Sequence, residues 1–315
     1  MKRDAAFYNE TQQLQGQIIQ AMRQTRPEVI QELSGQPLPP LLQVRGGYAE
    51  SPGWFMVQAA EFDPEPLTVA NLRVRDIYAS ERIVAALLEM LAGERWLARE
   101  GEAYRLTPAG RDIFDRLRAR TAKLLDPPSL PQPRAELERL VELLGKLFSL
   151  CLSAGDPPGS WCLAHSRRRA PGPDAPLLQQ ISQFMSDFNA YRDDAHMAAW
   201  QAEGVAAYVW EAFNFVHSGQ AKNAAELDEK LFFRGYSAGE WAGALQELRE
   251  RGWLDGAAGG DHTVTAAGYD VQASVEEATD NFFYAPWAKL AAGEAAELQE
   301  RLASLSQRLT EIVSG

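Results

Sequence analysis

Residues 78–117, YASERIVAALLEMLAGERWLAREGEAYRLTPAGRDIFDRL, carry the pattern that decides the fold. Ser80 precedes apolar residues at helical spacing, and its hydroxyl can accept hydrogen bonds from the free amides of the first helical turn. Trp96 and Leu97 then begin a short strand, a polar tip follows, and residues 104–107 form the return strand. The stretch therefore predicts a helix, a two-stranded hairpin and a further helix.

Residues 235–275, GYSAGEWAGALQELRERGWLDGAAGGDHTVTAAGYDVQASV, repeat this pattern, with Ser237 as the expected N-cap. At an offset of 157 residues, three pairs match: Leu91 with Leu248, Trp96 with Trp253 and Leu97 with Leu254. At an offset of 158 residues, two further pairs match: Thr107 with Thr265 and Gly110 with Gly268. The added residue falls in the hairpin tip, where a change of length is tolerated. Matched apolar positions at matched periods indicate a duplicated unit.

A further helix is expected before each copy, over residues 69–78 and 224–232, which completes a winged helix-turn-helix in both. The predicted fold class is mainly α with small two-stranded β wings. It consists of tandem winged helix-turn-helix domains with a helical middle region and a C-terminal helix.

Both copies resemble the wing region of MarR-type winged-helix regulators, through the segments YRLTPAGRDIF (104–114) and VTAAGYDV (264–271) with the Trp-Leu pair before each. The resemblance implies DNA binding and a small aromatic effector bound at a domain junction. Two copies in one chain imply a monomeric pseudo-dimer, with a homodimer as the alternative. Because winged helices also serve as protein-interaction modules, the resemblance is weakly specific for function.

The rest of the chain separates these copies. The Pro-rich run DPPSLPQP (126–133) breaks regular structure, an amphipathic helix is expected at 135–152, a long loop at 154–176 and a helix at 177–201. The expected organisation is an N-terminal winged-helix domain (1–125), a linker, loop and helical middle region (126–200), a second winged-helix domain (201–290) and a C-terminal helix (291–315).

Charge is spread unevenly along the chain, whose net charge is −12. Residues 1–125 hold 16 basic and 16 acidic residues, whereas residues 126–315 hold 15 basic and 27 acidic ones. Because an acidic surface repels phosphate, DNA contact is expected on the first copy. The arginines predicted to make that contact are Arg73, Arg75, Arg82, Arg99 and Arg105. The corresponding helix of the second copy presents Ala238, Gly239, Ala242 and Gln246, which offer no cation.

The segment NAYRDDAHMAAW (189–200) concentrates polar residues in an otherwise helical stretch. Three interpretations are open: a metal or acid–base site, a set of hydrogen bonds across a buried helix interface, and a role in ligand recognition. The second is preferred, because a transition-metal site needs three or four ligands and the other histidines lack ligand spacing. The cluster Arg192, Asp193, Asp194 and His196 is therefore predicted to be structural, with Asp193 or Asp194 bonded to a basic or amide partner and no metal bound.

Aromatic residues gather at 282–287, and with the aromatics of the previous segment they suggest two roles, a core and the wall of a small-molecule pocket. The residues proposed for ligand binding are Tyr191, Trp200, Phe283, Tyr284 and Trp287. The basic triplet Arg167–Arg169 is interpreted as part of a solvated loop, with phosphate binding as the alternative.

Other classes are disfavoured. No nucleophile elbow, phosphate-binding glycine loop, HExxH motif or CxxC pair occurs, so an enzyme, a catalytic residue, a cofactor and a metal are not expected. No apolar run suits a bilayer, and the first residues lack the apolar core of a signal peptide, so a cytoplasmic protein is expected. The leading hypothesis is a transcriptional regulator that binds DNA weakly through the first winged helix. The alternative is a winged-helix protein-interaction or ligand-binding module that does not bind DNA.

Overall fold

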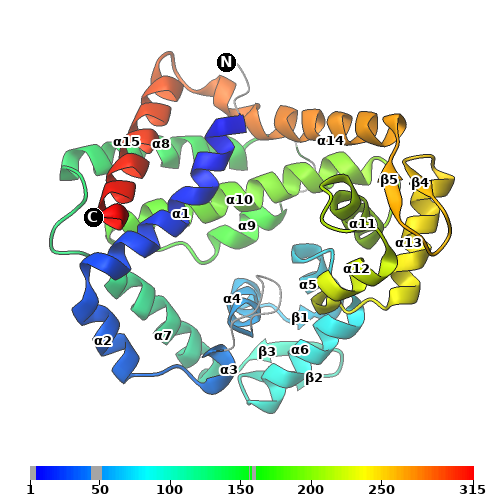
Figure 1. Ribbon diagram of the computed structural model, residues 1–315. Coiled ribbons are helices and arrows are strands. Elements are labelled where there is room, and N and C mark those ends of the chain that lie inside the picture. The colour runs from blue at the N-terminus through cyan, green and yellow to red at the C-terminus, as the bar shows by residue number, and fades with distance from the viewer. Residues whose placement is uncertain (1–4, 44–51, 156, 158–160) are drawn as a thin grey trace. The chain divides into compact units, whose positions relative to one another are not determined.

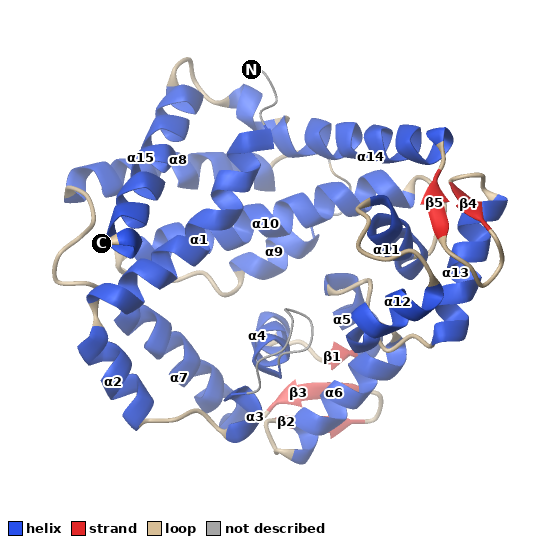
Figure 2. Ribbon diagram, in the orientation of Figure 1, coloured by secondary structure: helices blue, strands red, loops and turns tan. Residues whose placement is uncertain are grey.

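In the computed structural model, residues 5–43, 52–155, 157 and 161–315 are described. They are mainly helical, with two small antiparallel sheets (Figure 2). The chain forms two compact units, each assembled from segments that are distant in the sequence. Unit 1 comprises residues Met1–Leu38, Ile113–Ala195 and Asp280–Gly315; unit 2 comprises Pro39–Asp112 and His196–Thr279. The units therefore do not follow the four continuous ranges expected from the sequence, because the chain leaves unit 1 and returns to it twice.

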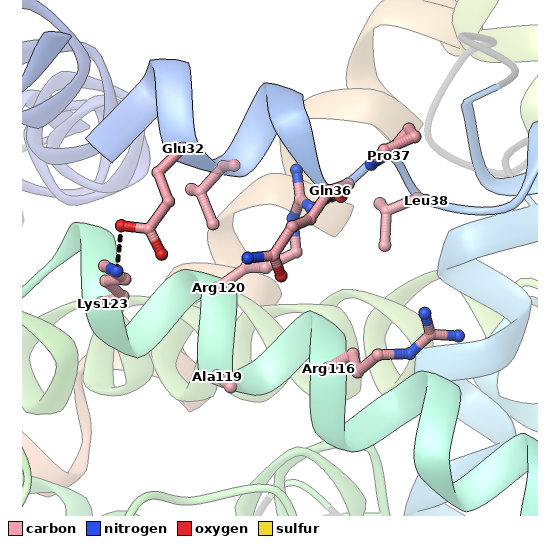
Figure 3. Close-up of a pocket in the computed structure, with 9 residues that line it drawn as sticks. Glu32, Gln36, Pro37, Leu38, Arg116, Ala119, Arg120 and Lys123 are labelled. Carbon is pink, nitrogen blue, oxygen red and sulfur yellow. Dashed lines mark hydrogen bonds and ion pairs between the residues drawn. The ribbon is translucent and has the colours of Figure 1, made fainter. Parts of the chain in front are cut away.

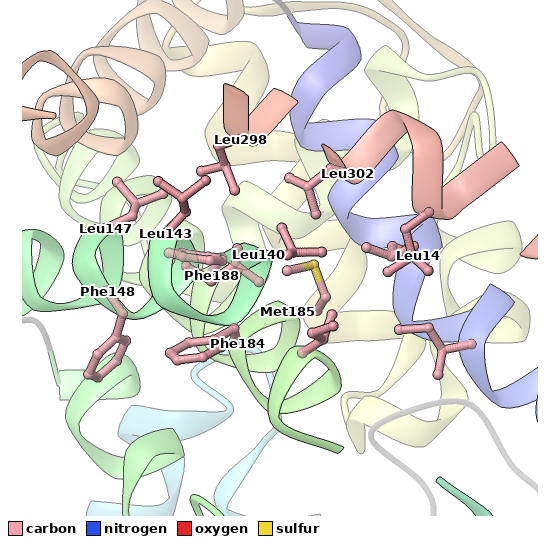
Figure 4. Packing of buried hydrophobic residues seen from close by; sticks show 14 of the residues in the cluster. Leu14, Leu140, Leu143, Leu147, Phe148, Phe184, Met185, Phe188, Leu298 and Leu302 are labelled. Atoms are coloured by element: carbon pink, nitrogen blue, oxygen red, sulfur yellow. The ribbon is translucent and has the colours of Figure 1, made fainter. Parts of the chain in front are cut away.

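Unit 1 is a helical assembly. Its helices are α1 (Ala5–Thr25), α2 (Pro27–Gly35), most of α7 (Pro108–Leu124), α8 (Arg134–Leu152), α9 (Trp161–Arg167), most of α10 (Leu177–Gln201), the end of α14 (Ala266–Tyr284), the 3-10 turn η2 (Pro286–Lys289) and α15 (Glu294–Ser314). The apolar stripe predicted for the C-terminal helix is buried in this unit, at Leu298, Leu302, Leu305 and Leu309. Figure 4 shows side chains from α1, α8, α10 and α15 meeting in the core.

Unit 2 holds both predicted copies. The first contains β1 (Leu67–Thr68), α5 (Val69–Arg75), α6 (Glu81–Gly93), β2 (Leu97–Glu100) and β3 (Ala103–Leu106), preceded by α3 (Pro40–Gln43) and α4 (Pro52–Phe62). The second contains α12 (Ala224–Lys230), the 3-10 turn η1 (Phe232–Arg234), α13 (Ala238–Glu250), β4 (Leu254–Gly256) and β5 (His262–Val264), preceded by α11 (Ala207–His217). The two copies are called the first segment (residues 67–112) and the second segment (residues 224–270), and both are visible in Figure 1.

Equivalent positions of the two segments have the same geometry. The amide of Thr107 donates to the carbonyl of Trp96 at 3.0 Å, and Thr265 donates to Trp253 at 3.0 Å. Both hairpins are antiparallel, with Leu97 opposite Leu106 and Leu254 opposite Val264, and β1 adds a short third strand to the first sheet. Local hydrogen bonding thus follows the sequence match, because the residues that set it are the matched ones.

A glycine follows each hairpin at the point where the next helix approaches the strand. A Cβ at Gly110 would lie 2.2 Å from the carbonyl oxygen of Trp96, and one at Gly268 would lie 2.3 Å from that of Trp253. Real Cβ atoms do not approach a backbone oxygen this closely, so both positions require glycine for the same reason.

The stretch 154–176 was expected to be an irregular loop, and this is wrong for part of it, because α9 occupies Trp161–Arg167. Both carboxylate oxygens of Asp194 accept a hydrogen bond at 2.9 Å, from the amides of Cys162 and Leu163 in the first turn of α9. A contact distant in sequence therefore satisfies amides that a short helix leaves without partners. Residues 156 and 158–160 lie outside the described part of the chain.

Candidate functional site

The candidate site includes the starts of α6 in the first segment and α13 in the second segment. Ser80 accepts a hydrogen bond from the amide of Ile83 at 3.3 Å and so caps α6, and Ser237 accepts from the amide of Glu240 at 3.3 Å and caps α13. Both N-caps predicted from the sequence are confirmed. The first turns of α6 and α13 are therefore rigidly defined.

These two helix starts meet inside unit 2. The amide of Ser80 donates to the carbonyl of Arg234 at 2.8 Å, and its hydroxyl donates to the carbonyl of Gly235 at 3.1 Å. Arg82 on α6 donates from Nη2 to Glu240 Oε2 at 2.8 Å, and it also binds the carbonyl of Gly235. The turns of the two segments consequently pack against each other.

Gly235 makes this close approach feasible. It has a φ of +73°, and a Cβ there would lie 2.5 Å from Ser80 Oγ and 2.9 Å from Ile83 Cβ. A side chain would therefore be strained by its backbone and would also separate the turns. Only glycine satisfies both demands at this position.

A buried ion network lies beside the turns. Arg234 donates from Nη1 to Asp76 Oδ1 at 2.9 Å and from Nη2 to Glu211 Oε1 at 2.7 Å. Its guanidinium also lies 5.5 Å from the ring centre of Tyr78 and 5.0 Å from that of Phe233. Asp76 belongs to the first segment, so one arginine of the second segment joins both. A guanidinium that donates to two carboxylates and lies near two aromatic rings suits this position better than the ammonium of lysine.

Burial controls protonation in this network. Desolvation raises the pKa of Glu211 to about 7 and outweighs the attraction of Arg234. Desolvation also raises the pKa of Asp76. The oxygens Asp76 Oδ2 and Glu211 Oε2 are buried without a hydrogen-bond partner among the described residues. Sequence reasoning missed this network, because its three members belong to different helices and turns and share no local spacing.

Each arginine predicted to contact DNA has an acidic partner in unit 2. The pairs are Arg73 with Glu81 at 3.0 Å, Arg75 with Glu61 at 3.4 Å, Arg82 with Glu240 at 2.8 Å, Arg99 with Glu89 at 2.7 Å and Arg105 with Glu100 at 2.8 Å. Arg75 differs from the others, since its side chain is buried. Arg82, Arg99 and Arg105 keep 63%, 58% and 42% of their side chains exposed, so they are the more accessible of these cations.

The net charge of unit 2, which holds both segments, is unfavourable to the binding of nucleic acid. Unit 2 contains 13 basic and 24 acidic residues, a net charge of −11, whereas unit 1 contains 18 basic and 19 acidic ones. The positions Ala238, Gly239, Ala242 and Gln246 are exposed on α13, as expected, and none carries a charge. Nearly all of the net negative charge of the chain therefore lies on unit 2.

The polar cluster of α10 makes structural hydrogen bonds. Besides the contacts of Asp194 with α9, Arg192 binds Asp280 at 2.9 Å. His196 accepts a hydrogen bond from Trp210 Nε1 at 3.2 Å, and its other ring nitrogen lies 3.3 Å from Thr279 Oγ1. The predicted bond between an aspartate of this cluster and amide groups is confirmed. Asp193 lies on the exposed side of α10.

The basic triplet is not a solvated loop at Arg167, so that interpretation is wrong for this residue. Arg167 pairs with the buried Asp187 at 3.0 Å, and its guanidinium lies 4.5 Å from the ring centre of Phe148. Since Asp187 also accepts hydrogen bonds from Ser166 and Gln183, each at 2.8 Å, the arginine belongs to a buried polar group of unit 1.

The aromatic residues proposed to bind a ligand are buried. Tyr191, Phe283, Tyr284 and Trp287 lie in the core of unit 1, and Trp200 lies in the core of unit 2. Trp200 stacks on Trp210 with ring centres 6.2 Å apart. Core packing, one of the two roles considered for these residues, accounts for their burial. Their role in ligand binding stays a prediction.

Residues 155–313, half of the chain, match the model of a helix-turn-helix family, and the chain belongs to that family. The match covers the second segment and the helices of unit 1 that flank it. Such a family is typical of DNA-binding regulators and not of enzymes. The comparisons with curated proteins and with solved structures gave no match. No helix in the described ranges is long and apolar enough to cross a membrane.

Proposed function

We propose that this protein is a tandem winged-helix regulator-like protein whose two helix-turn-helix segments form an intrachain pair. It acts as a protein-interaction or ligand-binding module and does not read DNA bases. One observation carries the proposal: the starts of α6 and α13 are bound to each other through Arg82, Glu240 and Gly235. In base-reading helix-turn-helix proteins, the N-terminal residues of the second helix contact base edges in the major groove. Here those residues hold the pair together.

Electrostatics supports the same proposal. A unit with a net charge of −11 repels a polyanion at long range, and the exposed face of α13 offers no cation to phosphate. An acidic unit of this kind suits a partner that carries a basic surface. The matched strands, caps and glycines support a common origin of the two segments.

Weak DNA binding through the first segment is the second candidate. The family match favours DNA binding in general, although it covers residues 155–313 and so not the first segment. The exposure of Arg99 and Arg105 in the β2–β3 hairpin gives the first segment a surface for such contact. Arg73 and Arg82 would extend that surface by exchanging their acidic partners for phosphate oxygens. Arg75 would contribute only after leaving its buried partner, Glu61.

Titration of a labelled genomic duplex between 50 and 200 mM salt separates the candidates. The interaction-module proposal expects no binding at 50 mM salt. Contact through Arg73, Arg82, Arg99 and Arg105 would instead give a log–log salt slope of about −3.6. Binding with such a slope, lost in the double variant Arg82→Glu, Arg105→Glu and retained in the control Gln246→Ala, would establish the DNA-binding candidate and overturn the first.

A further inference from the structure

A groove in unit 1 lies between α2 and α7. Its volume is about 320 Å³, at the lower end of the range that holds small ligands. Figure 3 shows α2 and the residues after it on one side and α7 on the other. It is lined by Glu32, Leu33, Gln36, Pro37 and Leu38 from the first side and by Arg116, Ala119, Arg120 and Lys123 from the second.

The spacing on α7 explains why the groove is basic. Arg116, Arg120 and Lys123 are separated by four and three residues, so they project from one face of the helix. Among the described residues that line the groove, Glu32 is the one carboxylate, and it is paired with Lys123. The groove is thus locally positive in a chain whose net charge is −12.

Arg120 is held in place without being saturated. It donates from Nη1 to the carbonyl of Gln36, which follows α2, at 2.6 Å. A guanidinium has five N–H donors, so further donors remain for a planar acceptor such as a carboxylate. Arg26 anchors the same region by donating from Nη1 to the carbonyls of Lys123 and Asp126, each at 2.7 Å. The groove is therefore formed by tethered helices before any ligand arrives.

The remaining lining is apolar. Leu33, Pro37, Leu38 and Ala119 provide a surface for a hydrocarbon or aromatic body next to the cations. A basic group beside an apolar wall is complementary to a molecule that has one acidic end and an apolar remainder.

We propose that the groove between α2 and α7 binds a small amphipathic carboxylic acid, with Arg120 as the main carboxylate contact and Leu33 and Leu38 against the apolar body. Arg116 adds positive charge, and Glu32 opposes the ligand and competes for Lys123. This site is independent of the function proposed for the paired turns, because the described lining residues all belong to unit 1.

Isothermal titration calorimetry of the full chain tests this with sodium octanoate, 1-octanol and inorganic phosphate as probes. Octanoate is expected to bind, and the uncharged alcohol and the phosphate are expected to bind at least about tenfold more weakly, since each lacks one of the two features. Equal affinity for octanol would overturn the carboxylate contact, and equal affinity for phosphate would overturn the apolar one. Absence of octanoate binding would overturn the whole proposal.

Variants locate the site. Arg120→Met keeps the methylene stem and removes the donors, so octanoate affinity should fall about tenfold. Arg118→Met is the matched control, because Arg118 lies on α7, is exposed and is absent from the lining of the groove. Equal affinities in these two variants would place the ligand elsewhere.

Glu32→Gln should raise the affinity for octanoate about threefold, because it removes the opposing charge and releases Lys123. This variant keeps the test sharp if Arg120→Met folds poorly. Unchanged or weaker octanoate binding in Glu32→Gln would contradict the proposed electrostatics.

Discussion

Arg234 and Asp76 form a buried ion pair between the second and the first segment, with Nη1 2.9 Å from Oδ1. The two residues are far apart in the sequence, and neither belongs to the motif by which the segments match. Because Glu211 binds the same guanidinium at 2.7 Å, Arg234 is the centre of the network that joins the segments inside unit 2. This network makes the packing of the turns testable.

Asp76→Ala should lower the free energy of unfolding by about 3 kcal/mol. Removing one partner of a buried pair costs about 3–5 kcal/mol, and the lower end applies at pH 8, where Glu211 is ionised and still neutralises Arg234. Urea denaturation measures the loss. The matched control Arg99→Ala breaks an exposed pair and should cost less than about 1 kcal/mol. Similar losses in both variants would contradict the buried network.

Glu211 predicts a specific pH dependence. The pKa of Glu211 is about 7 in the folded chain, against an ordinary value of 4.5. Between these values the folded state holds a proton that the unfolded state has released, so stability falls as the pH rises from 4.5 to 7. Above pH 7 this contribution is constant. The loss attributable to Glu211 is about 3 kcal/mol.

Glu211→Gln should abolish that part of the slope, and denaturation curves at pH 5, 6, 7 and 8 would show it as a difference from the natural chain. Glu240 and Glu297 have pKa values lowered to about 2, so the stability that they add is present above about pH 4.5 and is lost only at lower pH. These two groups therefore titrate below the range of pH 5 to 8 in which the curves are measured. Parallel curves for the two chains would rule out the shift at Glu211.

Gly110→Ala and Gly268→Ala should destabilise the protein to a similar degree, by about 1–3 kcal/mol, because each new Cβ collides with a strand carbonyl. Gly243→Ala on α13 is the control. A Cβ there has open space, and alanine is the better helix former, so stability should rise by about 0.5–1 kcal/mol. Thermal melts compare the three variants, and a harmless Gly268→Ala beside a damaging Gly110→Ala would argue against equivalent segments.

Asp194→Ala should release the first turn of α9. The carboxylate accepts two amide hydrogen bonds in a buried setting, so its loss should cost about 3 kcal/mol and speed hydrogen exchange at Cys162 and Leu163. Asp193→Ala, on the exposed side of α10, should change both quantities little. If exchange at α9 is the same in the two variants, Asp194 does not hold this helix.

Local patterns in the sequence were sufficient to predict the helices, caps and hairpins of the two segments. Ser80 and Ser237 cap their helices through bonds that span three residues, and Trp96 and Trp253 meet Thr107 and Thr265 across short hairpins. Interactions over such short separations are encoded in spacing alone, so the periodicity of the chain reveals them. The apolar stripe of α15 was equally readable, because burial of one helix face imposes its period on the sequence.

The pairing of the turns, by contrast, was decided only by tertiary structure. Ser80 bonds to Gly235 over 155 residues, and Arg82, predicted to face phosphate, bonds to Glu240 over 158. The sequence pattern of a helix predicts which of its charged side chains are exposed. It does not predict which distant residue each of them will contact. The same reason explains α9, whose Pro- and Gly-rich surroundings predict a loop until Asp194 supplies the missing acceptors. Contacts between residues so far apart produce no periodic pattern in the sequence, because local helix and strand formation does not depend on how many residues separate the two partners.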